Sequence, residues 1–163
     1  MIQIAVIGSN EIQNEKNKLI AYELGVELAK NNFILVCGGH QGVMKYVAKG
    51  VKANNGLTIG ILPENNTSFA NKYIDVKIAT GMGYARNIII IKSVDIVVSI
   101  EGASGTLSEI AHAMNENKLV IVLENTGGIS EFLAKNKDNF QQVNIAKSVQ
   151  DTINMILEFY SKR

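Results

Sequence analysis

Three glycine-rich turns in this chain have the composition of an anion-binding site. Each follows a short apolar run, and the second and third come directly before a segment that is typical of a helix. Glycine lets the backbone come close to a ligand, and the free N–H groups at the start of a helix attract negative charge. We therefore expect these turns to bind a phosphorylated small molecule, with ordinary tight turns as the alternative. The predicted binding residues are Gly8 and Ser9 in the first turn, Gly38, Gly39 and Gly42 in the second, and Gly102, Ser104, Gly105 and Thr106 in the third.

Arg86 and Glu109 are the charged side chains best suited to act beside such a phosphate. Arg86 is the only arginine before the last residue of the chain, and its planar guanidinium matches phosphate or carboxylate. The spacing of Thr106 and Glu109 is that of a capping box, which predicts that Thr106 caps a helix. A carboxylate in that first turn could also hold a ribose hydroxyl or act as an acid or base. We expect Arg86, Asn87 and Glu109 in the ligand site.

Two other residues near the second turn have open roles. His40 could reach the same crevice, and an ordinary polar loop residue is an equal interpretation. Cys37 ends an apolar run and is interpreted as a buried, small apolar residue.

The turns do not match the common nucleotide motifs. The first turn lacks the second and third glycines of the dinucleotide fingerprint, and no segment has the Walker A spacing. A pyridoxal-phosphate decarboxylase needs a Schiff-base lysine in its pocket, and no lysine is placed to suggest one. NAD binding, ATP hydrolysis and lysine decarboxylation are therefore disfavoured.

The charge balance and the apolar pattern exclude several partners. The net charge is +1, and the lysines are scattered rather than gathered in a stripe, which argues against nucleic acid. No apolar run approaches the length of a membrane helix, and the first residues do not resemble a signal peptide. One cysteine and two histidines cannot build a His-rich metal site. We expect a cytoplasmic protein with no bound metal.

Short β-branched runs alternate with helix-like segments, as in βαβ units. We predict one Rossmann-like α/β domain over residues 1–163, with a mainly parallel, doubly wound sheet and helices on both faces. Because the carboxyl ends of parallel strands share one edge, the three turns should meet in one crevice. The predicted strands span residues 2–7, 33–37, 57–62, 73–78, 95–100, 119–123 and 142–145. The predicted helices span residues 14–30, 42–53, 106–117, 130–136 and 148–160.

The four isoleucines at positions 88–91 allow two interpretations, a buried strand or a helix that is apolar nearly all round. If residues 85–93 form a helix, one apolar side faces the sheet and another needs cover. We expect a second subunit to provide it, in a dimer or tetramer formed through residues 86–93.

Over residues 2–123 the sequence resembles the SLOG superfamily. That group includes LOG-type cytokinin phosphoribohydrolases, proteins long mislabelled as lysine decarboxylases, and bacterial homologues of molybdenum-cofactor carrier proteins. Residues 37–44 are similar to the early glycine turn of the superfamily, and residues 102–109 to its G-G-x-G-T-x-x-E motif. Residues 81–87 look most like the carrier branch. Glu101, Ala103 and Asn87 depart from the phosphoribohydrolase pattern, which has proline, glycine and lysine there.

The resemblance implies two candidate functions. The carrier branch implies a protein that binds a phosphorylated, molybdopterin-type or nucleotide-like ligand and requires no cofactor for chemistry of its own. The alternative is a nucleoside 5′-monophosphate phosphoribohydrolase, in which Arg86 and Glu109 match the pair implicated in cleavage of the N-glycosidic bond. The departures at positions 87, 101 and 103 favour the carrier.

Overall fold

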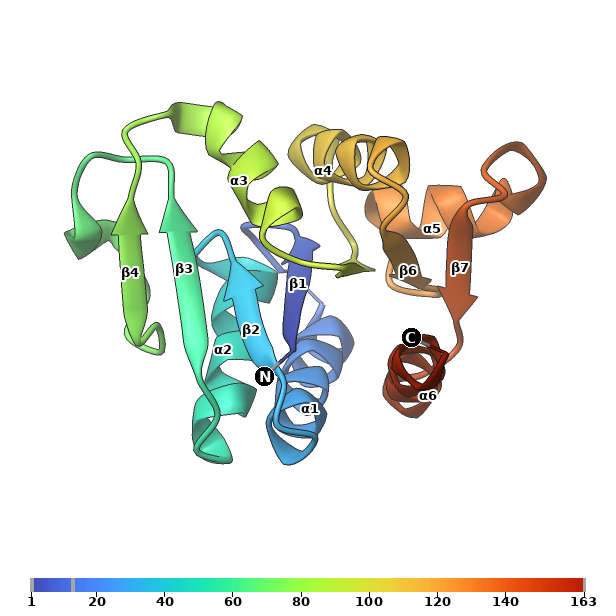
Figure 1. The fold of residues 1–163 in the computed structure, drawn as a ribbon, viewed down its shortest axis with the longest axis horizontal. Helices are drawn as coiled ribbons and strands as arrows, with labels where there is room; N and C mark the ends of the chain where they lie inside the picture. Colours follow the sequence, from blue (N-terminus) through green and yellow to red (C-terminus); the bar gives the residue numbers. More distant parts are fainter. Residues whose placement is uncertain (1, 13, 163) are drawn as a thin grey trace.

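The strands of this protein form one parallel sheet, in a computed structural model that describes residues 2–12 and 14–162. Within this part of the chain the sheet has seven strands in the order β4-β3-β2-β1-β5-β6-β7 (Figure 1). The order reverses direction at β1, which lies between β2 and β5. The strands are β1 (Gln3–Gly8), β2 (Ile34–Cys37), β3 (Thr58–Leu62), β4 (Val76–Ala79), β5 (Ile96–Ile100), β6 (Leu119–Leu123) and β7 (Val143–Ala146).

Helices pack on both faces of the sheet, which makes this a doubly wound α/β domain. One face carries α1 (Glu15–Lys30), α2 (Gly42–Ala53) and α6 (Val149–Ser161). The other carries α3 (Asn87–Lys92), α4 (Ser104–Asn115) and α5 (Gly128–Lys135). Three short 3-10 turns, η1 (Thr67–Phe69), η2 (Gly83–Arg86) and η3 (Lys137–Asn139), lie among the described residues. The predicted fold class is confirmed.

The two cores follow from alternation along the strands. In β1, Ile4 and Val6 point into the core beneath α1, α2 and α6, whereas Ala5 and Ile7 point into the opposite core. Successive side chains of a strand face opposite sides of the sheet, so a strand that is apolar throughout can be buried on both faces. This pattern fixes the face of the sheet that each β1 side chain occupies, and the parallel pairing of Gly8 with Ile100 of β5 places Gly8 at the carboxyl edge.

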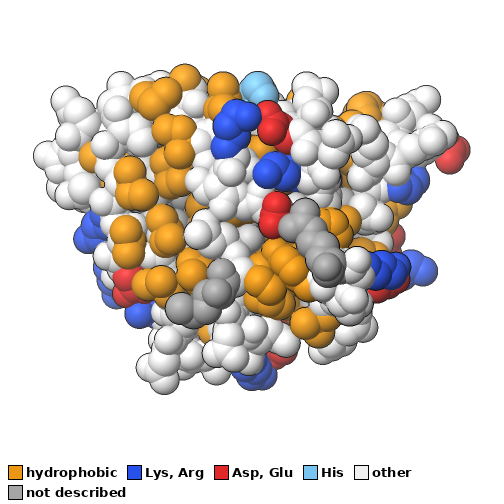
Figure 2. Space-filling view, viewed as in Figure 1, with side chains coloured by type: hydrophobic (Ala, Val, Ile, Leu, Met, Phe, Trp, Pro, Cys, Tyr) orange, Lys and Arg blue, Asp and Glu red, His pale blue; other side chains and the backbone are white. Residues whose placement is uncertain are grey.

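The isoleucine run forms the helix α3 rather than a strand. Ile90 and Ile91 are buried in the core beneath α3, α4 and α5, while Ile88 is exposed. Close to this helix in sequence, β4 leaves Val76 and Ile78 exposed on the same face of the sheet as Ile61. Figure 2 shows hydrophobic side chains gathered over β3 and β4 on this side of the molecule.

Two leucines in the predicted helices lie on the surface. Leu19 in α1 and Leu157 in α6 are exposed, because the buried stripes of these helices run through neighbouring positions. In α1 that stripe contains Ala21, Leu24 and Leu28. Small residues such as alanine let the helix approach the sheet closely. No helix among the described residues is long and apolar enough to cross a membrane.

Candidate functional site

A pocket of about 690 Å³ lies at the carboxyl edge of the sheet, where the strand order reverses. Its walls come from the turns after β1, β2, β3 and β5, together with η2 and the first turns of α3 and α4. Open α/β sheets bind ligands at such a switch point, and the volume is in the range of small-molecule sites. The prediction that the turns after the first, second and fifth strands meet in one crevice is therefore confirmed.

The pocket brings together most of the predicted site residues and excludes three of them. Those that line it are Gly8, Ser9, Gly38, Arg86, Asn87, Ser104, Gly105, Thr106 and Glu109. Gly39, Gly42 and Gly102 do not line it. A side chain at Gly42 would lie 2.1 Å from the Ser9 carbonyl oxygen, and one at Gly102 would overlap Thr106. These glycines allow neighbouring turns to pack against each other.

The turn after β1 is held by both of its neighbours. The Ser9 hydroxyl oxygen accepts a hydrogen bond from the backbone N–H of Gly102, at 3.1 Å. The Ser9 carbonyl accepts one from Val43 N–H at 2.9 Å, and the Asn10 side chain accepts one from Gln41 N–H at 3.2 Å. The amino terminus of α2 is therefore engaged by protein atoms, and Ser9 links it to the turn after β5.

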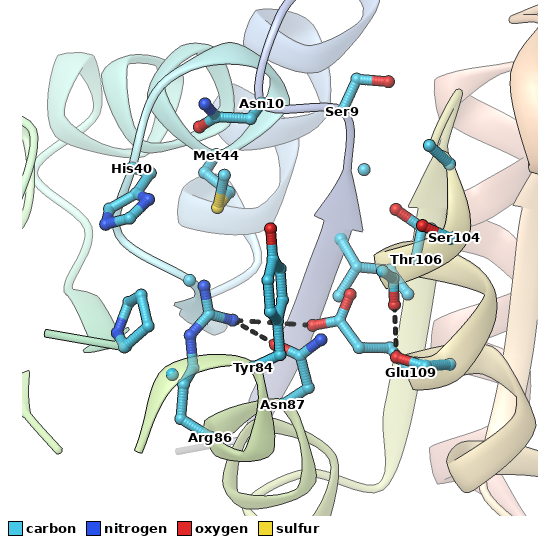
Figure 3. A pocket seen from close by; sticks show the side chains of 18 of the residues that line it. Ser9, Asn10, His40, Met44, Tyr84, Arg86, Asn87, Ser104, Thr106 and Glu109 are labelled. Atoms are coloured by element: carbon cyan, nitrogen blue, oxygen red, sulfur yellow. Dashed lines mark hydrogen bonds and ion pairs between the residues drawn. The ribbon is translucent and has the colours of Figure 1, made fainter. Parts of the chain in front are cut away.

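The amino terminus of α4 is open to the pocket. The helix begins at Ser104, and Ala103 at the N-cap position provides no side-chain hydrogen bond. The N–H groups of a first helical turn have no partner within the helix, and Ser104, Gly105 and Thr106 line the pocket at the positive end of the helix dipole. Figure 3 shows Ser104 and Thr106 at one side of the pocket.

The predicted capping box is wrong. Thr106 lies in the third helical position rather than at the cap, and its side chain is buried. The chain turns already at Gly102, which has a φ of +98°, so the N-cap is Ala103, three residues earlier than the spacing predicts. Glu109 is consequently free of a capping role, and it points into the pocket (Figure 3).

Arg86 and Glu109 form a buried ion pair on the pocket wall. The two residues are 8% and 7% exposed, and Arg86 Nη1 lies 3.9 Å from Glu109 Oε1. The same nitrogen donates a 2.7 Å hydrogen bond to the side-chain oxygen of Asn87, whereas Arg86 Nε has no hydrogen-bond partner among the described residues. At 3.9 Å the pair attracts without a hydrogen bond, so both groups keep the capacity to bind a ligand.

Burial governs the protonation of this pair. It raises the pKa of Glu109 to about 7, although the nearby Arg86 charge acts to lower it. Burial also lowers the pKa of Arg86 from its ordinary value, against the attraction of Glu109. Because an arginine pKa starts so high, Arg86 stays charged, and Glu109 is the group that titrates near neutral pH.

Cys37 and His40 have different surroundings. Cys37 is fully buried at the end of β2, and burial raises the pKa of its thiol to about 11, which confirms its interpretation as an apolar core residue. His40 lines the pocket, and its Nε2 lies 3.0 Å from Glu64 Oε2.

The pocket also contains residues that the sequence reasoning missed, namely Asn10, Met44, Pro63, Glu64 and Tyr84. Glu64 had a usable signal, because it follows Pro63 at the end of a predicted parallel strand and therefore lies on the carboxyl edge of the sheet. Tyr84 had no comparable signal. Its place depends on how the loop between β4 and α3 crosses the sheet.

The fold and the pocket define a doubly wound α/β domain with a small-molecule site at its topological switch point. The chain belongs to the SLOG cluster4 family, whose model matches residues 1–153. The predicted relationship to the SLOG superfamily is confirmed.

Relatives of known structure point to one branch. The molybdenum cofactor binding protein of Rippkaea orientalis is 38% identical with a TM-score of 0.88, and the match covers 98% of this chain and 97% of that one. The molybdenum cofactor carrier protein of Chlamydomonas reinhardtii is 30% identical with a TM-score of 0.85, covering 98% of each chain. An uncharacterized protein of Archaeoglobus fulgidus is 44% identical over 124 residues, which are 76% of this chain and 81% of that protein.

Proposed function

We propose that this protein binds and carries a molybdopterin-type ligand in the pocket at the carboxyl edge of its sheet. The open first turn of α4 carries the proposal, because it offers unpaired N–H groups to an anion inside a pocket of about 690 Å³. The similarity to two molybdenum cofactor proteins, at 38% and 30% identity over nearly the whole chain, supports this ligand class. The cytoplasmic location remains a prediction from the sequence.

The ligand phosphate is proposed to lie at the N–H groups of Ser104, Gly105 and Thr106. The Ser9 hydroxyl oxygen already accepts a hydrogen bond from Gly102, so its hydrogen remains able to donate to the phosphate. Arg86 lies on the pocket wall, where its Nε has no partner within the described part of the chain and Glu109 only partly neutralises its charge. We expect its guanidinium to contact the ligand between the phosphate and the heterocycle.

Phosphoribohydrolase activity is the competing function, and the comparisons do not favour it. The Arg86–Glu109 pair is present, but the two solved relatives described above are cofactor-binding proteins. A carrier uses the pair to bind its ligand, whereas a hydrolase needs Glu109 to assist bond cleavage. The two functions therefore differ in whether a nucleotide is turned over.

Native mass spectrometry of the freshly purified protein tests the proposal first. We expect a bound mass of a phosphorylated pterin, which releases a fluorescent pterin on acid oxidation. Incubation with AMP should release no ribose 5-phosphate. Release of ribose 5-phosphate that disappears in Glu109→Gln would instead identify a hydrolase and overturn the carrier proposal.

We also propose that a second copy of the chain covers the exposed apolar surface at Ile88 and on β4. Strands of parallel sheets are usually covered on both faces, yet Val76 and Ile78 remain exposed. Sedimentation at micromolar concentration should show a dimer or tetramer, which Ile88→Lys or Ile78→Lys weakens. Leu157→Lys, on the opposite face of the sheet, is the matched control. A monomeric parent protein would contradict this proposal.

A further inference from the structure

Tyr84 is an aromatic side chain that lines the pocket without packing against the protein. It is 86% exposed although it belongs to the pocket wall, and no aromatic partner is found for its ring among the described residues. Figure 3 shows the ring standing in the pocket between His40 and Thr106. A large apolar ring gains free energy when it is covered, so this position suits stacking against a flat ligand group.

Glu64 and His40 form a polar pair on the wall of the same pocket. His40 Nε2 and Glu64 Oε2 are 3.0 Å apart, and both residues line the pocket. Partial burial acts to raise the pKa of Glu64, but its hydrogen bond with His40 and the charge of Arg86 help to lower it below the ordinary value. Glu64 is therefore ionised at neutral pH, and an ionised carboxylate only accepts hydrogen bonds.

This pair and the open end of α4 lie on different sides of the pocket. Figure 3 places His40 on one side and Ser104 on the other, with Tyr84 between them. A ligand whose phosphate binds at Ser104–Thr106 therefore extends its other end past Tyr84 toward Glu64. That end should carry hydrogen-bond donors, because the group that it meets is an acceptor.

We propose that Tyr84 stacks on the heterocycle of the ligand and that Glu64, oriented by His40, accepts hydrogen bonds from a 2-amino-4-oxopyrimidine edge. Pterins and guanine share this edge, with an amino group and a ring N–H side by side, and a carboxylate can accept from both at once. Adenine lacks the paired donors. The inference rests on the proposed function, because it takes the phosphate position at α4 as given.

Binding of three nucleoside monophosphates to the purified protein tests this inference by calorimetry. GMP presents both donors at this edge, IMP presents one, and AMP presents none. We expect affinity to fall in that order, with GMP about ten- to a hundredfold tighter than AMP. Glu64→Gln should remove most of this preference, because its amide opposes the ligand N–H groups with one of its own.

Two controls separate this inference from the proposed function. Ribose 5-phosphate reports on the phosphate position alone, so Glu64→Gln should leave its affinity unchanged. Tyr84→Leu should weaken all three nucleotides by a similar factor, about tenfold, whereas Tyr84→Phe retains binding. The phosphate ester of 6-hydroxymethylpterin carries the same edge as GMP, and the tighter of the two identifies a pterin or a guanine as the natural group.

The outcomes are distinct. Equal affinity for GMP and AMP, with ribose 5-phosphate still bound, overturns the inference and leaves the proposed function standing. Absence of binding by every phosphate ester overturns the proposed function as well. A GMP preference that survives in Glu64→Gln assigns the edge to another group and also overturns the inference.

Discussion

The turns that precede α2 and α4 are similar in sequence, but the backbone N–H groups at the two helix starts have different surroundings. Both follow a buried strand, are rich in glycine, and start a helix without a side-chain cap. In the turn before α2, Val43 N–H and Gln41 N–H donate to Ser9 and Asn10. At the start of α4, Ser104, Gly105 and Thr106 line the pocket, and their N–H groups have no partner within the helix.

The difference shows that glycine in a βα turn has two separate uses. At Gly42 its lack of a side chain allows the turn after β1 to pack closely, and its φ of +59° suits glycine. At Gly105 an added Cβ would meet nothing within 4 Å, so its small size leaves room for a ligand instead. We call the turn before α2 the closed turn and the turn before α4 the open turn.

Alanine substitutions at Gly42 and Gly105 should test the difference between the closed turn and the open turn most clearly. Gly42→Ala places a Cβ 2.1 Å from the Ser9 carbonyl oxygen at a positive φ, so we expect a loss of about 3 kcal/mol or more in the free energy of unfolding. Gly105→Ala is the matched control and should change stability by less than about 1 kcal/mol while weakening phosphate binding. Urea unfolding measures the first effect and calorimetry the second. Equal destabilisation by both substitutions would contradict the distinction.

Glu109, on the helix that follows the open turn, should make stability depend on pH. Burial raises its pKa from 4.5 to about 7, so the folded protein binds more protons than the unfolded chain between these values. The free energy of unfolding should therefore fall as pH rises from about 4.5 to 7, by up to about 3 kcal/mol. Glu109→Gln cannot titrate and should lose this slope. Urea midpoints at several pH values measure this slope. Parallel pH profiles for the parent protein and Glu109→Gln would show that Glu109 does not cause it.

Arg86 lies between the closed turn and the helix that follows the open turn, so its removal tests how the two parts of the site cooperate. Its guanidinium lies against Gly38 of the closed turn, and it faces Glu109 across 3.9 Å. We expect Arg86→Ala to weaken binding of a phosphorylated ligand by about 1.5–3 kcal/mol, the scale of a charge-assisted hydrogen bond. Arg86→Lys, which keeps the charge but not the planar fork, should recover part of the loss. Unchanged affinity in Arg86→Ala would remove this residue from the site.

Closing the open turn with a cap should produce the smallest effect. Ala103 has the extended backbone of an N-cap residue, so the carboxylate of Ala103→Asp can accept from the free N–H groups. We expect about 1 kcal/mol of added stability, together with weaker binding of ribose 5-phosphate. Gain of stability without loss of affinity would show that the ligand phosphate binds elsewhere.

The sequence predicted every strand and every α-helix except α3, which it left open between strand and helix, because apolar periodicity is a local signal. The ends of elements were less certain, and α4 shows why. A capping-box spacing at Thr106 and Glu109 competed with a glycine turn at Gly102, and the turn determined where the helix begins. The exposure of Leu19 likewise follows only from the folded structure, since burial depends on what packs against a helix.

In the site, too, the sequence predicted some features and the tertiary structure decided others. Glycines that end parallel strands were recognisable from the chain alone, because strand ends share an edge in any parallel sheet. The chain alone did not show which glycines line the pocket and which pack turns together. The contacts and backbone angles that distinguish Gly42 from Gly105 arise only in the folded chain. The 7% exposure of Glu109 and its distance to Arg86 likewise depend on segments far apart in sequence.

The amino-acid sequence by itself determined the α/β class, the edge of the sheet at which the pocket lies, and the presence of Arg86 and Glu109 near it. Short-range patterns of apolar and glycine residues are sufficient for these. Only the tertiary structure decided that the amino terminus of α4 is open whereas that of α2 is engaged. It also decided that Tyr84 and Glu64 line the pocket. Those features arise from contacts between turns that the chain brings together only when it folds.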